Sequence, residues 1–223
     1  MAHQPLSRGT RSPRGASEGR RARLTFRRLS GLDRSGPPPP ETAAGAPLHP
    51  WTVPNVIGYV RAALIPVFLV LALSSDHGTD ALPAVIFAVV AWGDYADGIA
   101  ARVTGQYSRL GAILDPIVDR ATVLSGAVVC WHFELLPRWA LAVLAAREAL
   151  MLVASPLLVR RGVELKINWP GRLAVFPVMS AIFVGLVGLK VVAQILLYIG
   201  LVLTLWATVL YARTAVRQLS SST

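Results

Sequence analysis

The chain has 223 residues, of which 54% are hydrophobic and 15% charged, and its mean hydropathy is +0.54. This composition excludes an ordinary water-soluble domain and is typical of a polytopic membrane protein with a polar tail. The net charge is +10, and a single cysteine excludes a disulfide framework.

The polar tail occupies residues 1–50, and we expect it to be disordered because it is rich in Arg, Ser, Gly and Pro. Before Pro50, nine arginines stand against three acids, so +6 of the net charge lies in this tail. That location favours an anionic membrane surface as its partner and argues against nucleic acid. Within the tail, Arg21–Leu32 mixes arginines with apolar residues and could form a short interfacial helix.

Residues 51–215 are predicted to form an all-α membrane domain. Six apolar segments follow one another, each close to the roughly 20 residues that a membrane-spanning helix needs. Residues 216–223 then form a short polar C-terminal tail. The predicted spans are 54–73, 82–101, 111–132, 138–158, 172–188 and 191–211.

The charges of the linkers predict an orientation. The linkers after the first, third and fifth spans carry only Arg138 and Lys190 among their basic residues. The linkers after the second and fourth spans carry more: Arg102, Arg109, Arg160, Arg161 and Lys166. Because basic loops stay inside the cell, we expect a multi-pass protein of the cell membrane with both termini on the cytoplasmic side.

Two pairs of acids interrupt the apolar pattern. Asp94 and Asp97 are three residues apart, and Asp115 and Asp119 are four apart, so each pair shares one face of a helix. A carboxylate at the centre of a span costs about 2.5–3.5 kcal/mol, so four of them call for a function. Salt bridges to nearby arginines account for part of the charge but not for this spacing. Clustered carboxylates suit magnesium, manganese or calcium, and two such ions can clamp a pyrophosphate.

The acids belong to a longer pattern. In this pattern DxxDGxxAR is followed after eight residues by G, and then by two D, each after three further residues. The pattern is the signature of the CDP-alcohol phosphatidyltransferase family, which this sequence resembles. The resemblance implies a dimeric integral membrane enzyme that moves a phosphatidyl group from CDP-diacylglycerol to an alcohol and releases CMP. Every fixed position is matched: Asp94, Asp97, Gly98, Ala101, Arg102, Gly111, Asp115 and Asp119.

The resemblance also implies roles for the signature residues. Asp94, Asp97 and Asp115 would bind two divalent ions, Mg²⁺ or Mn²⁺, and Asp119 would be both a metal ligand and the general base. The choice of Asp119 as the base depends on the family more than on its spacing.

A nucleotide site is predicted beside these acids. By resemblance, Gly98 and Ala101 are the small residues against which the cytidine nucleotide lies. Arg102 and Arg109 have guanidinium groups that can donate paired hydrogen bonds to phosphate oxygens. These four residues are our candidates for nucleotide binding.

The acceptor site is predicted from four basic residues. Arg61 lies inside the first span, where it either reaches back to the interface or faces the site. Arg147 stands beside Glu148 inside the fourth span. The stretch Lys166–Arg172 is similar to the KxxWxGK/R stretch of phosphatidylglycerophosphate synthases, although it also fits a solvated cytoplasmic loop. The candidates for binding an anionic acceptor are Arg61, Arg147, Lys166 and Arg172.

These motifs favour glycerol 3-phosphate as the acceptor, which makes the protein a phosphatidylglycerophosphate synthase. The alternative in the same family is a cardiolipin synthase, which uses phosphatidylglycerol. Two alternatives come from other classes. A cation transporter also keeps acids inside the membrane, and it predicts ion flux without CMP release. A membrane scaffold predicts that Asp119→Asn changes no activity.

Overall fold

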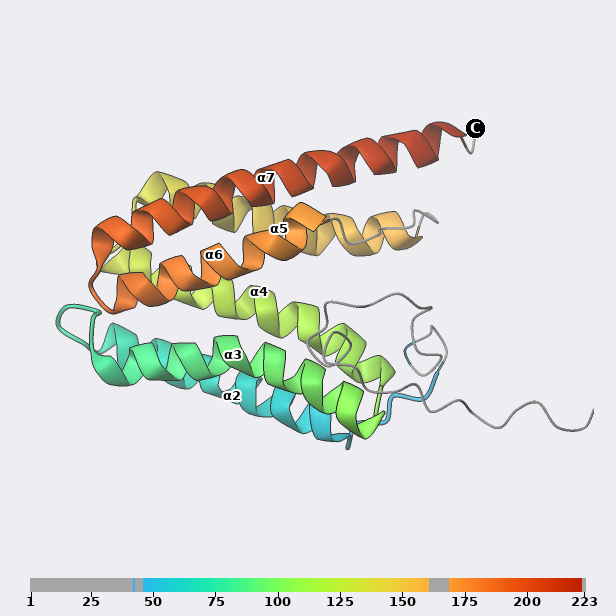
Figure 1. Ribbon diagram of the computed structural model, residues 1–223, viewed down its shortest axis with the longest axis horizontal. Coiled ribbons are helices and arrows are strands. Elements are labelled where there is room, and N and C mark those ends of the chain that lie inside the picture. The colour runs from blue at the N-terminus through green and yellow to red at the C-terminus, as the bar shows by residue number, and fades with distance from the viewer. Residues whose placement is uncertain (1–41, 43–45, 161–168, 222–223) are drawn as a thin grey trace, which may run out of the picture.

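The computed structural model describes residues 42, 46–160 and 169–221. In this part of the chain the regular secondary structure is helical, which confirms the all-α prediction (Figure 1). Most of the predicted tail, including Arg21–Leu32, and also Lys166 lie outside the described residues. Six helices are described: α2 (Val53–Leu73), α3 (Ala81–Thr104), α4 (Arg109–His132), α5 (Arg138–Arg160), α6 (Trp169–Leu186) and α7 (Lys190–Ser221).

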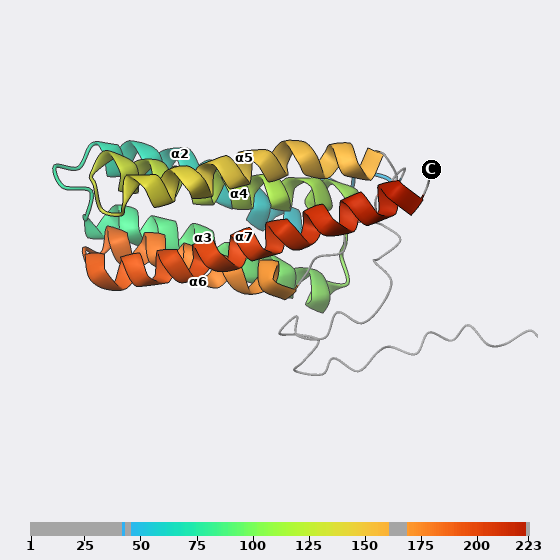
Figure 2. The same cartoon turned by 90° about the horizontal axis from the view of Figure 1, so that it is seen from above.

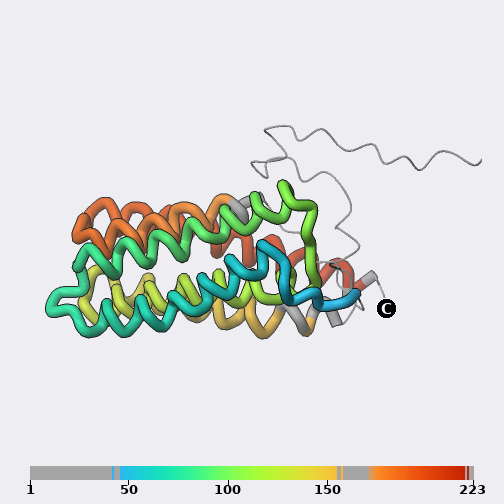
Figure 3. The backbone as a smooth tube through the Cα atoms, turned by 90° about the horizontal axis from the view of Figure 1, so that it is seen from below, coloured from blue at the N-terminus to red at the C-terminus, as the bar shows by residue number. Residues whose placement is uncertain are grey.

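Consecutive helices run in opposite directions, so the bundle has two distinct ends (Figures 1 and 2). One end, which we call the signature end, holds the start of α2, the α3–α4 connection and the end of α7. Figure 3 shows the α3–α4 connection beside the start of α2 at this end. Helix α4 packs against α2, α3, α5 and α6, so it joins the two halves of the bundle.

Capping groups determine where the helices of the signature end begin and stop. The side chain of Thr52 accepts a hydrogen bond from the Asn55 amide and begins α2. The side chain of Ser108 accepts one from the Gly111 amide at 2.9 Å and begins α4. Gly105 ends α3 with a φ of 66°, a left-handed conformation that costs glycine little. The short link between α3 and α4 therefore keeps their charged ends close together.

The hydrophobic core fills the half of the bundle away from the signature end. Phe68 of α2 and Phe87 of α3 are buried there, with ring centroids 5.4 Å apart. Leu141 and Leu144 of α5 and Ile182 of α6 are buried in the same cluster. This apolar packing anchors the helices, so the opposite half can accommodate charged side chains.

Large apolar side chains also cover the outside of the bundle, as a surface in contact with lipid requires. Val60, Val70 and Val202, for example, are each more than half exposed. By length and hydropathy, three helices of the described chain could cross a membrane: α2, α3 and the Lys190–Gln218 part of α7. This confirms a membrane protein with several apolar helices.

The predicted count of six spans exceeds the number of helices that meet this criterion. Helices α4 and α5 carry charged residues within their length, and α6 offers only the shorter apolar stretch Leu173–Leu186. At the other end of the chain, α7 continues to Ser221. Much of the predicted polar tail 216–223 is therefore the last part of a helix.

Candidate active site

The four signature acids come from two helices that meet at the signature end. Asp94 and Asp97 lie on the last turns of α3, and Asp115 and Asp119 lie on the first turns of α4. Asp97 is buried, whereas the side chains of Asp94 and Asp119 are 47% and 39% exposed. The acids therefore stand at the boundary between the packed interior and an open surface.

Arg61 of α2 lies between the acids of both helices. Its Nη1 atom is 2.9 Å from Asp97 Oδ2 and 3.7 Å from Asp94 Oδ1, and its Nη2 atom is 2.7 Å from Asp119 Oδ1. Its Nε atom donates a hydrogen bond to the Val90 carbonyl oxygen at 3.0 Å. The side chain is only 2% exposed, so Arg61 faces the site and does not reach back to the interface.

Gly93 makes this position of Arg61 possible. A Cβ atom at Gly93 would lie 2.6 Å from Cδ and 2.8 Å from Cγ of Arg61, closer than packed atoms come. The Arg61 side chain thus crosses α3 in the space that the missing side chain leaves. Sequence reasoning missed Gly93, although its place directly before Asp94 in an apolar span is an available signal.

A second group of contacts ties the start of α2 to the start of α4. The Asn55 side chain donates to the carbonyl oxygens of His49 and Pro50 and accepts a hydrogen bond of 2.9 Å from Ser108 Oγ. A Cβ atom at Gly111 would lie 2.7 Å from Asn55 Oδ1. The glycine of the signature therefore makes room for Asn55 in this fold. Ser108 is another residue that sequence reasoning missed.

The donor chemistry of the acid cluster fits a hard divalent ion. Carboxylate oxygens are the ligands that magnesium and manganese prefer. Within the described residues, however, no three acidic, histidine or cysteine side chains are grouped so that they could hold a metal ion. The guanidinium of Arg61 stands among Asp94, Asp97 and Asp119 instead.

The predicted nucleotide residues line the same end of the bundle. Gly98 and Ala101 are partly buried on α3. A Cβ atom at Gly98 would lie 3.3 Å from Nη1 of Arg102, so the guanidinium of Arg102 covers Gly98. Arg109 is the first residue of α4, directly after the Ser108 cap.

The predicted acceptor residues do not form one group in the described structure. Arg147 of α5 lies apart from Arg61: it pairs with Glu148 and donates a hydrogen bond of 3.1 Å to Thr208 Oγ1 of α7. Lys166 lies outside the described residues, and Arg172 lies in the first turn of α6 with its side chain outside the description. The acceptor role of all four stays a prediction.

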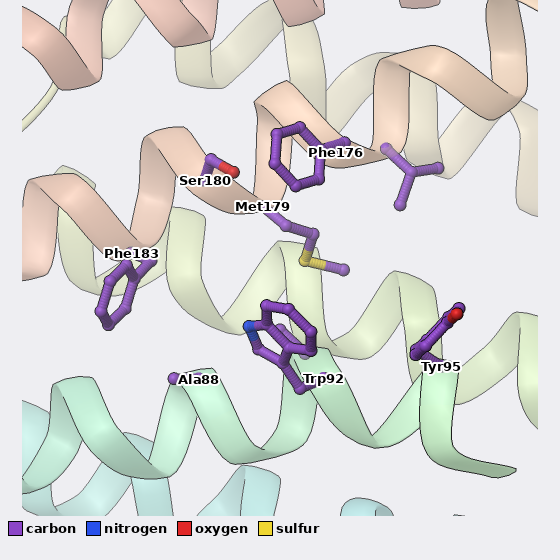
Figure 4. A pocket seen from close by; sticks show the side chains of 9 residues that line it. Ala88, Trp92, Tyr95, Phe176, Met179, Ser180 and Phe183 are labelled. Atoms are coloured by element: carbon purple, nitrogen blue, oxygen red, sulfur yellow. The ribbon is translucent and has the colours of Figure 1, made fainter. Parts of the chain in front are cut away.

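An apolar cavity of about 580 Å³ opens between α3 and α6, close to Asp94 in the chain. Figure 4 shows Trp92 and Tyr95 of α3 facing Phe176 and Met179 of α6. The side chains of Trp92 and Tyr95 are 69% and 46% exposed. The cavity is lined by Ala88, Ala91, Trp92, Tyr95, Val175, Phe176, Met179, Ser180 and Phe183.

The chain is similar to a known protein family and to several named proteins. Residues 51–206 match the CDP-alcohol phosphatidyltransferase family. A "Cardiolipin synthase (CMP-forming)" of Streptomyces coelicolor is 36% identical over 166 residues, covering 72% of this chain and 77% of that protein. A "Probable phosphatidylglycerophosphate synthase" of Mycobacterium tuberculosis is 30% identical over 175 residues, covering 74% and 82%. A "CDP-diacylglycerol--glycerol-3-phosphate 3-phosphatidyltransferase" of Haemophilus influenzae is 26% identical over 177 residues, covering 74% and 94%.

The fold and the site define a helical membrane protein in which carboxylates of two antiparallel helices meet at one end of the bundle. The chain belongs to the CDP-alcohol phosphatidyltransferase family, because the matched region covers α2 to α6 and part of α7. It is a phospholipid-synthesising transferase, and the family uses CDP-diacylglycerol and an alcohol acceptor. The prediction of an enzyme is confirmed over a transporter or a scaffold.

Proposed function

We propose that the protein is a cardiolipin synthase, which transfers the phosphatidyl group of CDP-diacylglycerol to phosphatidylglycerol and releases CMP. The relative named as a cardiolipin synthase shares 36% identity with this chain. The relative named as a probable phosphatidylglycerophosphate synthase shares 30%, and the one named as a CDP-diacylglycerol--glycerol-3-phosphate 3-phosphatidyltransferase shares 26%. The sequence motifs alone favour glycerol 3-phosphate. The identities support the alternative acceptor, and glycerol 3-phosphate becomes the second candidate.

The choice of acceptor rests on these identities, and the observation that carries the phosphatidyl-transfer chemistry is the approach of acids from α3 and α4 to one cationic group, Arg61. Bound divalent ions would neutralise the pyrophosphate of CDP-diacylglycerol and stabilise the leaving phosphate. Two ions, Mg²⁺ or Mn²⁺, would be held by the carboxylates of the signature: Asp94, Asp97, Asp115 and Asp119.

We assign the role of general base to Asp119. Its carboxylate takes the proton of the free glycerol hydroxyl of phosphatidylglycerol. The hydroxyl oxygen forms a bond to the phosphatidyl phosphorus, and the bond between this phosphorus and the bridging oxygen of the pyrophosphate breaks. The electrons of that bond leave with CMP. Partial exposure makes Asp119 accessible to an acceptor, as it does Asp94, whereas Asp97 is buried; the choice of Asp119 over Asp94 follows the family resemblance.

Other residues of the signature end would bind CDP-diacylglycerol. Arg102 and Arg109 provide guanidinium donors for its phosphates. Gly98 and Ala101 leave space for the nucleotide against α3. The apolar cavity between α3 and α6 suits one acyl chain, because it opens on the outer surface and is lined mainly by aromatic and aliphatic side chains.

We also propose that all six helices cross the cell membrane and that the signature end faces the cytoplasm. The charges of α4 and α5 lower their hydropathy, yet Glu148, for example, is buried inside the bundle. Arg102 and Arg109 at the signature end fit the positive-inside rule. A second copy of the chain is the expected partner, as the family resemblance implies.

The test is an assay of the full-length protein purified in detergent with CDP-diacylglycerol and Mn²⁺ or Mg²⁺. We expect CMP release and cardiolipin formation with phosphatidylglycerol, and loss of both in Asp119→Asn and after chelation of the metal. Turnover with glycerol 3-phosphate and none with phosphatidylglycerol would refute the cardiolipin synthase proposal and support the second candidate. Unchanged CMP release in Asp119→Asn would refute the role of the base.

A further inference from the structure

Helix α7 is the longest helix of the described chain, and Figure 1 shows its last part extending past the start of α6 at the signature end. It has 32 residues, whereas α6, which packs beside it, has 18. At 1.5 Å per residue, α7 is about 48 Å long. Even at a tilt of about 40°, it would cover about 37 Å of depth, more than a hydrocarbon core of about 30 Å. The last part of α7 therefore reaches the layer of lipid headgroups.

One exposed face of α7 changes from apolar to cationic toward the C-terminal end of the helix. Val202, Trp206 and Val209 are spaced by four and three residues, so they share this face, and they are 65%, 57% and 48% exposed. Arg213 and Arg217 continue the same face at spacings of four residues, and both are exposed. We call Arg213 and Arg217 the α7 arginine pair. The face thus matches lipid at two depths, with apolar residues beside acyl chains and arginines beside headgroups.

The charge of the α7 arginine pair is not balanced along its own helix. The sequence from Lys190 to Thr223 contains no Asp or Glu. Ala215, on the opposite side of the same turns, is only 6% exposed, so this side of α7 packs against the protein. The end of α7 is therefore oriented with its two positive charges outward.

From these observations we propose that the α7 arginine pair is a docking site for the headgroups of anionic phospholipids. The arginines reach the depth at which lipid phosphates lie, and a guanidinium can donate paired hydrogen bonds to phosphate oxygens. Each basic residue near a membrane surface strengthens the attraction of anionic lipid about fivefold. The acyl chains of the bound lipid lie along Val202, Trp206 and Val209.

This docking site has a consequence for the enzyme. CDP-diacylglycerol, the lipid substrate of the family, is itself anionic. The α7 arginine pair lies at the signature end, so it can raise the concentration of anionic lipid beside the end of the bundle that carries the signature acids. The docking site does not depend on which alcohol is the acceptor.

The experiment uses Trp206 as the reporter, because it lies on the same face as the α7 arginine pair. The full-length protein is placed in nanodiscs of phosphatidylcholine that contain either brominated phosphatidylglycerol or brominated phosphatidylcholine, since bromine on an acyl chain quenches tryptophan fluorescence on contact. The quenching that is lost in Trp206→Phe belongs to Trp206. In the wild type we expect Trp206 to prefer phosphatidylglycerol at least about fivefold, and in Arg213→Gln with Arg217→Gln we expect a preference of less than about twofold.

Lys190→Gln is the matched control, because it removes a positive charge from the other end of the same helix, about 24 Å from Trp206. It should leave the preference unchanged. A wild-type preference of less than about twofold, or an unchanged preference in the double variant, would overturn the inference. Quenching of Trp206 by neither lipid would also overturn it, because another protein surface, such as a second copy of the chain, would then cover this face.

The wild type alone decides if the double variant does not fold. The preference for phosphatidylglycerol must then decrease as the salt concentration is raised from about 0.1 to 1 M, because salt screens the attraction between the arginines and the headgroup. A preference that salt does not change would overturn the inference. The readout is lipid binding, so failure of the proposed transferase reaction would appear separately, in the assay of CMP release.

Discussion

Replacement of Arg61 by methionine tests whether its guanidinium holds the signature end together. The substitution keeps an unbranched side chain of similar length but removes the charge that contacts Asp97 and Asp119. Asp97 is 5% exposed, so its carboxylate would remain buried without a partner. Removal of one partner of a buried ion pair costs about 3–5 kcal/mol. At about 2–4 °C per kcal/mol for a chain of this size, the melting temperature should fall by about 6–20 °C.

The assay is thermal unfolding of the purified protein in detergent without added metal. Arg138→Met is the control, because Arg138 forms an exposed pair with Glu134 and such pairs contribute at most about 1 kcal/mol. In the double variant Arg61→Met with Asp97→Asn we expect part of the lost stability to return, since the buried charge is gone. An Arg61→Met protein as stable as the Arg138→Met control would refute the reasoning.

Two further predictions concern glycines at the signature end. Gly93→Ala should destabilise the protein, because the new Cβ atom would lie 2.6 Å from Cδ of Arg61. Gly185→Ala in α6 is the control and should be neutral or stabilising, because the nearest atom to its new Cβ is 3.6 Å away. The melting temperatures of the two variants test this difference. Gly111→Ala should lower the melting temperature through its 2.7 Å contact with Asn55 Oδ1, and the same substitution in an Asn55→Ala background should cost less. Equal effects of Gly111→Ala in both backgrounds would contradict the contact.

The sequence by itself determined the helical class, the membrane character and the signature residues of the site. These features are local: apolar segments of suitable length predict helices in a membrane, and a spacing of three or four residues places two acids on one face. The fixed distances between Asp94 and Asp119 were enough to indicate the family. The sequence did not determine how many of the helices span the membrane, because the hydropathy of one helix does not show whether its charges pair with another helix.

Only the tertiary structure decided which distant residues complete the site. Arg61 and Asp119 are 58 residues apart, and Arg147 and Thr208 are 61 apart, so their contacts depend on how whole helices pack. The packing turned Arg61 inward, left space at Gly93 and Gly111 for the side chains of Arg61 and Asn55, and placed Arg147 in contact with Glu148 and Thr208. The physical reason is that a buried charge is stabilised by a partner on another helix. The spacing of residues in the sequence specifies the face of the helix on which a side chain lies, but not which helix packs against that face.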